Sequence, residues 1–128
     1  MASILLVDDD ELLRGVLAKA LVLGGHAVIQ ASDGKAAVKL AQTQAIDLVI
    51  TDIVMPVQEG LETIMALRRE HPGLPIIAMS GGATNSKLYL QIAAKVGARR
   101  MLSKPFSPGQ LLDLVDEVLK SPPSGTKG

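Results

Sequence analysis

Residues 4–10 read Ile4-Leu5-Leu6-Val7-Asp8-Asp9-Asp10, an apolar run that leads directly into three acids. The run Leu48-Val49-Ile50 leads in the same way to Asp52, and Met101-Leu102 leads to Lys104-Pro105. If these runs are neighbouring parallel strands, the acids meet at one edge of the sheet beside an ammonium group. Carboxylates gathered around one point repel each other unless a cation lies among them. The pattern therefore indicates a Mg2+-dependent phosphoryl-transfer site more than a folding device.

The rest of the chain alternates between two kinds of segment. The apolar runs are nearly continuous in Val, Ile, Leu and Met, which is typical of strands buried on both faces of a parallel sheet. Such runs occupy residues 3–7, 27–31, 47–51, 75–79 and 99–102. The segments between them have apolar residues at helical spacing, and right-handed crossovers would place these helices on both faces. We predict an α/β fold with a five-stranded parallel sheet in the order 2-1-3-4-5, because the acids that end the first and third strands must be adjacent.

The expected helices follow from spacing and from start and stop signals. The first carries the apolar series that begins with Leu12 and Val16, and the third begins at about Leu61. The first helix is ended by Gly24-Gly25, and the second is capped by Ser32 or Asp33 and has Ala37, Leu40 and Ala41 on its apolar side. The third runs from about 61 to 71, and the fourth covers about 86–96 and is ended by Gly97. The last helix starts at Ser107-Pro108 and is expected to bury Leu111, Leu112, Val115, Val118 and Leu119.

Composition limits the function classes. The 128 residues fit one domain over 1–120, followed by a Pro/Ser/Gly-rich stretch at 121–128 that we expect to be a disordered tail or a truncated linker. There is no cysteine, so thiolate metal sites are excluded. The formal net charge is zero and no basic stripe is present, which argues against direct nucleic-acid binding by this domain. No apolar stretch is long enough for a membrane span, so we expect a cytoplasmic protein.

The strand ends supply a complete set of groups for phosphoryl transfer. Mg2+ takes a few oxygen ligands and keeps several waters. We assign Asp9 and Asp52 as direct ligands, Asp8 as a ligand directly or through water, and the backbone carbonyl of Val54 as a further ligand. Asp52 is then the candidate nucleophile, which would form an acyl phosphate. Lys104 can pair with the transferred group, and the hydroxyl of Ser80, at the end of the fourth predicted strand, can donate a hydrogen bond to it; with Asp8, Asp9, Asp52 and Val54 these complete the expected site.

The motifs at these strand ends resemble a two-component response regulator receiver domain over residues 3 to about 120. The resemblance is carried by four pieces in order, residues 4–10, 47–56 with Gly60, 75–81, and Lys104-Pro105-Phe106. It implies a flavodoxin-like fold and phosphorylation of Asp52 by a sensor histidine kinase or a phosphotransfer protein. It also implies signalling to an output protein through protein contacts, rather than metabolic catalysis, and a cis peptide bond between Lys104 and Pro105.

One position departs from the family pattern. Where these domains usually have Tyr or Phe on the fifth strand, this chain has Met101. In the family a Ser or Thr hydroxyl, here Ser80, is coupled to rotation of that ring. We therefore assign Ser80 and Met101 as the switch pair, with a flexible Met101 that repacks in place of the ring. We also interpret Met55, Met65, Met79 and Met101 as core residues.

Two other functions compete with this interpretation. A phosphohydrolase of the haloacid dehalogenase type needs an Asp-x-Asp motif, and Asp8 and Asp10 satisfy that bare spacing. It would leave Asp52 without a role. A receiver-like binding module that is never phosphorylated is the second alternative, and Met101 is the feature that favours it. Asp9 or Asp10 could also serve only as a helix N-cap.

The sequence predicts slow loss of a phosphoryl group from Asp52. The residues two positions after Asp52 and Ser80 are Val54 and Gly82, and neither has a polar side chain that could orient an attacking water. We expect the phosphoryl-aspartate of the isolated protein to persist well beyond seconds. Its decay can be followed by intact mass after removal of the phosphodonor, and a lifetime of only seconds would contradict the prediction.

Overall fold

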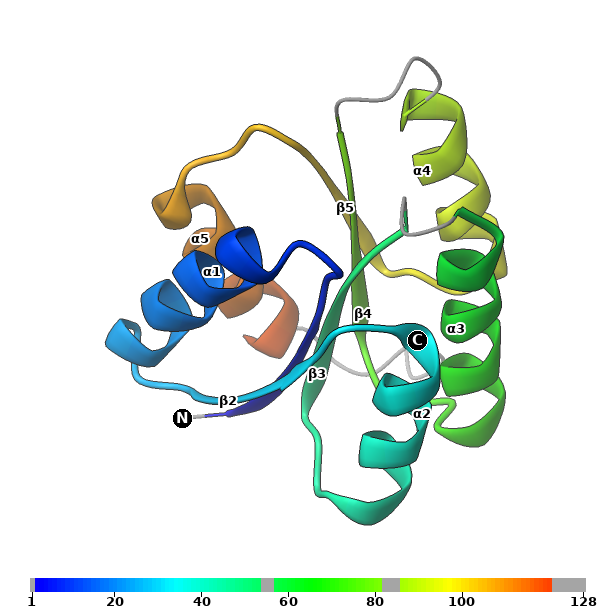
Figure 1. Ribbon diagram of the computed structural model, residues 1–128, viewed down its shortest axis with the longest axis horizontal. Coiled ribbons are helices and arrows are strands. Elements are labelled where there is room, and N and C mark those ends of the chain that lie inside the picture. Colours follow the sequence, from blue (N-terminus) through cyan, green and yellow to red (C-terminus); the bar gives the residue numbers. More distant parts are fainter. Residues whose placement is uncertain (1, 54–56, 82–85, 121–128) are drawn as a thin grey trace.

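The computed structural model describes residues 2–53, 57–81 and 86–120, which form an open parallel sheet between two layers of helices (Figure 1). Strands and helices alternate along the chain. The elements in chain order are β1 (Ser3–Val7), α1 (Glu11–Leu23), β2 (Ala27–Ala31), α2 (Gly34–Thr43), β3 (Leu48–Asp52), α3 (Val57–Glu70), β4 (Ile76–Ser80), α4 (Ser86–Val96), β5 (Arg100–Ser103) and α5 (Pro108–Lys120). The strand order is β2-β1-β3-β4-β5, so the predicted topology is confirmed.

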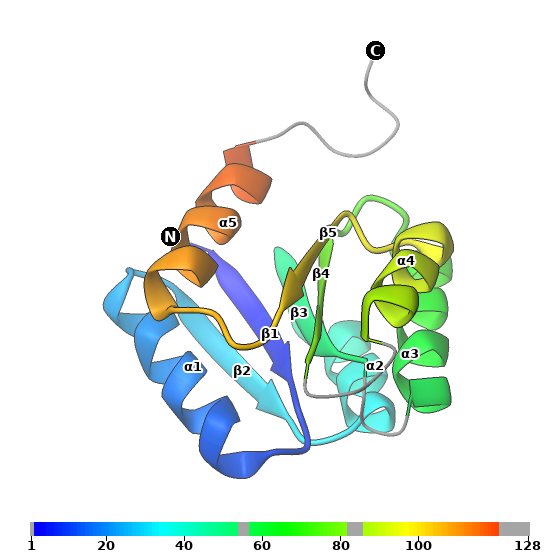
Figure 2. The same ribbon diagram turned by 90° about the horizontal axis from the view of Figure 1, so that it is seen from above.

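Each face of the sheet has its own apolar core. Helices α1 and α5 cover one face, and α2, α3 and α4 cover the other, as the view from above shows (Figure 2). Side chains alternate along each strand, so Leu5 and Val49 face the three-helix layer while Ile4 and Ile50 face the two-helix layer. The three central strands are buried at nearly every position, which is why their sequences read as continuous apolar runs.

Local signals set the helix ends. Asp10 caps α1 by accepting a hydrogen bond from the Leu13 N–H at 3.1 Å, and Asp33 caps α2 in the same way. At the start of α5, Ser107 and Gln110 form a reciprocal capping box: the Ser107 hydroxyl accepts from the Gln110 N–H at 3.1 Å, and the Gln110 side chain accepts from the Ser107 N–H at 2.8 Å. Asp33 and Asp10 settle the two cap choices that the sequence left open.

Expectations about one helix start and about the burial of several apolar residues were wrong. Helix α3 begins at Val57, about one turn before the predicted start at Leu61. Leu12 and Val16 are exposed, since α1 packs only through its other side, around Leu17 and Leu21. Met101 is 38% exposed because β5 is the edge strand, and Met65 is also exposed, whereas Met79 is buried as predicted. Met55 lies outside the described residues. On α5, Leu112 and Leu119 are only partly buried.

Strand register brings the functional strand ends together. Val7 lies opposite Thr51, so Asp8 and Asp52 follow at the same level on adjacent strands. Strand β4 continues the series, because its Met79 pairs with Asp52 and Ser80 pairs with Ser103. Lys104 comes directly after Ser103. The register alone thus carries acids, hydroxyl and ammonium to one edge of the sheet.

Two glycines allow close approach at that edge. A Cβ on Gly60 would lie 2.6 Å from the Cα of Ile53, so the missing side chain lets α3 pack against the end of β3. A Cβ on Gly81 would lie 2.3 Å from the Cβ of Lys104 and 2.9 Å from its Cα. The Lys104–Pro105 peptide bond is cis, as expected. Gly81 therefore fixes how near β4 lies to the lysine.

Two other expectations concern the ends of the chain and membranes. Within the described ranges, no helix combines the length and apolar character that crossing a bilayer requires. Helix α5 ends at Lys120, and the tail at 121–128 lies outside the described residues, so its disorder stays a prediction.

Replacing Gly81 with alanine is expected to lower the free energy of unfolding by about 1–3 kcal/mol, the usual cost of overpacking. The new methyl group would meet the backbone of Lys104, which cannot move aside as a flexible side chain could. Gly15→Ala is the matched control, because no atom lies within 4 Å of its Cβ position in α1. That change should stabilise the protein by about 1 kcal/mol. Urea unfolding measures both, and equal effects of the two changes would contradict the prediction.

Candidate functional site

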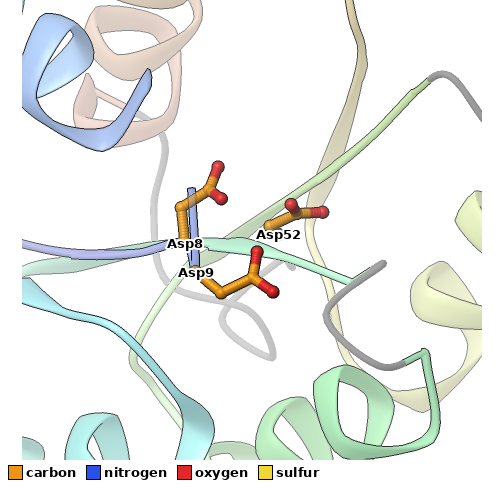
Figure 3. A group of neighbouring side chains, drawn as sticks. All are labelled: Asp8, Asp9 and Asp52. Carbon is orange, nitrogen blue, oxygen red and sulfur yellow. The ribbon is translucent and has the colours of Figure 1, made fainter. Parts of the chain in front are cut away.

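Three carboxylates converge where β1 and β3 end. One oxygen from each of Asp8, Asp9 and Asp52 lies within 4.8 Å of the others. Figure 3 shows the three side chains around a shared space, two from the end of β1 and one from the end of β3. Asp8 is fully buried, Asp52 is 5% exposed, and Asp9 is exposed. The predicted convergence of these acids is confirmed.

One ammonium group bridges the two buried acids. The Lys104 Nζ lies 3.1 Å from the Asp8 Oδ2 and 3.0 Å from the Asp52 Oδ2. Burial works against the charged form of this lysine, but the charges of Asp52 and Asp8 and their hydrogen bonds outweigh it and raise the Lys104 pKa above its usual value. Lys104 is therefore held as a cation between two anions.

The Asp8 carboxyl is in a less favourable position. Burial raises its pKa, and the nearby charge of Asp52 adds to the rise. The backbone N–H of Asp10 donates to the Asp8 Oδ1 at 2.9 Å and, together with Lys104, opposes that shift. The charged form of Asp8 is thus disfavoured first by its burial and then by repulsion from Asp52. A second cation at this edge would relieve the remaining repulsion.

Ser80 provides a buried hydroxyl at the end of β4. Its Oγ is buried and makes no hydrogen bond within the described part of the chain, while its carbonyl oxygen accepts from the Lys104 N–H at 2.7 Å. A buried hydroxyl that lacks a partner costs free energy. An oxygen-rich group bound beside Lys104 could accept this hydrogen bond.

The remaining predicted residues lie differently. Met101 pairs with Ala78, two positions before the Ser80–Ser103 pair, so strand alternation directs Met101 and Ser80 to the same face of the sheet. Met101 is exposed rather than buried beside Ser80. Val54, whose carbonyl was predicted to bind the metal, lies outside the described residues, as does Gly82.

Sequence analysis missed Arg14. Its Nη1 donates to the backbone carbonyl of Asp8 at 2.7 Å, and its Nε donates to the Gln30 Oε1 at 3.0 Å. Arg14 thereby ties the acid-bearing turn after β1 to α1 and β2. A cation near a helix N-terminus is disfavoured by the helix dipole, and this mismatch was the available signal.

The donor set suits a small, hard divalent cation. Its side chains offer carboxylate oxygens only, and Mg2+ prefers oxygen ligands and retains waters in its remaining positions. Asp9, which is exposed, could bind such an ion without losing a protein partner. Asp10 is engaged as the cap of α1, so the cluster contains Asp8 and Asp9 rather than Asp8 and Asp10.

Comparison with known families gives one clear match. Residues 4–116 match the response regulator receiver domain. The chain is 37% identical over 120 residues to the transcriptional regulatory protein CpxR of Escherichia coli, covering 94% of this chain and 50% of CpxR. It is 38% identical over 120 residues to the DNA-binding transcriptional regulator NtrC of Azospirillum brasilense, covering 94% of this chain and 24% of NtrC. The chain thus spans between a quarter and a half of these relatives.

Solved structures agree with that match. The receiver domain of NtrX from Brucella abortus superposes with a TM-score of 0.85 at 29% identity, covering 92% of this chain and 98% of that domain. The chemotaxis protein CheY4 of Vibrio cholerae superposes with a TM-score of 0.82 at 34% identity, with the same coverage of 92% and 98%. The flavodoxin-like fold is therefore confirmed, and the chain belongs to the response regulator receiver domain family of two-component signalling systems.

Proposed function

We propose that this receiver domain accepts a phosphoryl group on Asp52 from the phosphohistidine of a sensor kinase or phosphotransfer protein, in a Mg2+-dependent reaction. The observation that carries the proposal is the bridge from Lys104 to both Asp8 and Asp52, at 3.1 and 3.0 Å. A lysine held between two buried acids is poised to follow new negative charge that arrives on one of them. The family supplies the class of partner.

The chemistry assigns one role to each side chain. An oxygen of the Asp52 carboxylate attacks the phosphorus, the bond from phosphorus to the donor nitrogen breaks, and its electron pair stays with the imidazole. Lys104 keeps its contact near Asp52 and pairs with the phosphoryl oxygens. The Ser80 hydroxyl, which has no partner within the described residues, donates to one of them. Arg14 holds the turn that carries Asp8 and Asp9.

Mg2+ would be held by Asp8, Asp9 and Asp52, with the Val54 carbonyl as a further predicted ligand. When bound, it supplies charge neutralisation and a fixed position for the phosphoryl oxygens. The support for this assignment is the oxygen-only cluster, in which one lysine contacts both buried acids.

Output is proposed to pass through protein contacts. Phosphorylation adds about two negative charges beside Ser80 and Lys104, which would shift the loops after β4 and β5. With Met101 in place of an aromatic residue, repacking of this exposed side chain next to β4 would report the change. Nucleic-acid binding is not assigned to this domain, in line with its formal net charge of zero. The relative NtrC is a DNA-binding regulator of which the chain spans 24%.

Different observations argue against the two alternative functions. The phosphohydrolase hypothesis required Asp8 and Asp10 to act together, but Asp10 caps α1 and the chain belongs to another family. The hypothesis of a module that is never phosphorylated is opposed by the retained acids and by Lys104. Phosphorylation of the isolated domain separates it from our proposal.

Incubation with acetyl phosphate and Mg2+ tests the proposal. We expect intact mass to increase by one phosphoryl group in the wild-type protein and not in Asp52→Asn. The matched control is Asp113→Asn on α5, an exposed carboxylate that should leave the modification unchanged. Chelation of the metal with EDTA should abolish the gain. Equal modification of wild type and Asp52→Asn would overturn the assignment of Asp52.

Lys104→Met is expected to lower the free energy of unfolding at neutral pH by about 3 kcal/mol, because two buried carboxylates lose their counter-ion. This is the low end for a buried pair, since the lysine side chain is 21% exposed. Millimolar Mg2+ should recover part of the loss by supplying a replacement cation.

Urea unfolding with and without Mg2+ measures this effect. Lys39→Met, a change at an exposed lysine on α2, is the control and should be nearly neutral. Wild-type stability in Lys104→Met would show that the lysine does not compensate the acids.

A further inference from the structure

A pocket with a basic lining lies at the amino ends of β4 and β5, opposite the carboxyl ends where the acids gather. Its volume is about 250 Å3, and its charged lining residues are Arg68, Lys95 and Arg99. Arg68 lies near the end of α3, Lys95 lies in the last turn of α4, and Arg99 directly precedes β5. Helices α3 and α4 lie side by side on the same face of the sheet in both views (Figures 1 and 2). Three cations from different elements therefore surround one small space.

None of these three cations forms an ion pair with an acid of the described residues. Among the described residues, no carboxylate lies within 4.0 Å of the charged groups of Arg68, Lys95 or Arg99. The neighbouring Arg100 is different, because it pairs with Glu117 at 3.2 Å. The Arg99 Nη2 is buried and has no hydrogen-bond partner in this part of the chain. Such a donor costs free energy unless a partner is supplied from outside.

The two arginines are tied to the fold, while Lys95 is exposed. Gly97 has a φ of +137°, and a Cβ there would lie 3.1–3.3 Å from the Cγ, Cβ and Cδ atoms of Arg68, so the stem of this arginine lies across the glycine. The Arg68 Nη1 donates to the carbonyl of Pro72. The backbone N–H of Arg99 donates to the Ile76 carbonyl at 2.8 Å. The Arg68 guanidinium is thus held by a hydrogen bond, and the backbone of Arg99 is held against the start of β4.

Compensation of helix dipoles explains only part of the cluster. Lysine and arginine are favoured in the last turn of a helix, which accounts for Arg68 and Lys95. Arg99 lies beyond Gly97, outside α4, and gains no such benefit. Burial lowers the pKa of the Arg99 guanidinium, and the charges of Arg100 and Arg68 lower it further. Among the described residues, nothing compensates the charge of Arg99, and helix dipoles do not explain its place in the pocket.

We propose that this pocket binds a phosphate-type dianion, through Arg68, Lys95 and Arg99. Three cations match a group with two negative charges and at least three oxygens better than a carboxylate, which has one charge and two oxygens. Guanidinium groups bind such oxyanions through paired hydrogen bonds, and a lysine adds a point charge. The pocket is smaller than the roughly 300–1,000 Å3 of sites for drug-sized ligands, so it fits a single phosphate group rather than a nucleotide. This group is either free inorganic phosphate or the phosphate of a monoester.

Titration of the intact chain with inorganic phosphate tests the proposal. The titration is followed by amide NMR shifts at constant ionic strength, without Mg2+, in the Asp52→Asn background to exclude the acidic site. We expect saturable shifts centred on Gly97 and Arg99. Phenyl phosphate in a second arm distinguishes a monoester from the free ion, and sodium acetate tests whether a single charge is sufficient. Tighter binding of phenyl phosphate would assign a monoester, and tighter binding of inorganic phosphate the free ion.

Two variants separate binding from folding. Lys95→Gln is exposed and should fold normally, and Arg99→Gln removes the unpartnered guanidinium. Each change should raise the dissociation constant for phosphate at least fivefold. Lys87→Gln, at an exposed lysine elsewhere on α4, should leave it unchanged. Arg99→Gln should also raise the melting temperature without phosphate, because it removes buried repulsion. The proposal is overturned if shifts do not saturate, if acetate matches phosphate, or if Lys95→Gln and Arg99→Gln bind as wild type does.

Discussion

The main constraint on this structure is that two buried carboxylates share one ammonium group. Asp8 and Asp52 lie on adjacent strands because Val7 pairs with Thr51, and Lys104 reaches both from the end of the edge strand β5. A buried ion pair usually breaks even at best, and here one cation serves two anions. The two negative charges of Asp8 and Asp52 are therefore only partly neutralised by the single positive charge of Lys104. A protein that only needed stability would be better served by apolar residues at these positions, so the deficit indicates a site built to receive a cation and new oxygen atoms.

Most of the fold could be predicted because its determinants are local. Continuous apolar runs define the buried strands, and the caps Asp10, Asp33 and Ser107 define helix starts. The strand order followed from one requirement, that the acids after the first and third strands be neighbours. The errors arose where tertiary packing decides. The close approach of α3 to the end of β3 at Gly60 is a contact between distant elements, and the exposure of Leu12 depends on how much of α1 the sheet covers.

The candidate site was predictable in its membership but not in its connections. Asp8, Asp9, Asp52, Ser80 and Lys104 all follow apolar runs, and register carries them to one edge. The contact between Arg14 and the carbonyl of Asp8 was missed, because a cation near the start of a helix is a weak signal that does not identify the backbone oxygen it binds. The position of Met101 was missed for a similar reason, since its exposure follows from β5 being the last strand of the sheet. The basic pocket depends on the stem of Arg68 crossing Gly97, a contact between α3 and the residue after α4 that spacing along the chain does not encode.

The acidic site and the basic pocket can coexist because one strand length separates them. Strand β4 has five residues, Ile76–Ser80, with the pocket at its first end and Ser80 at its last. With four steps of about 3.3 Å between Ile76 and Ser80, the two ends are roughly 13 Å apart, which is more than the Debye length of about 8 Å at physiological ionic strength. Arg68 and Arg99 therefore add little to the compensation of Asp8 and Asp52, and Lys104 remains the principal protein cation there. The same separation means that an anion in the pocket would not compete with a phosphoryl group on Asp52. In a parallel sheet the amino ends of the strands lie on one side and the carboxyl ends on the other. Opposite charges on these two sides are separated by the apolar core and do not neutralise each other.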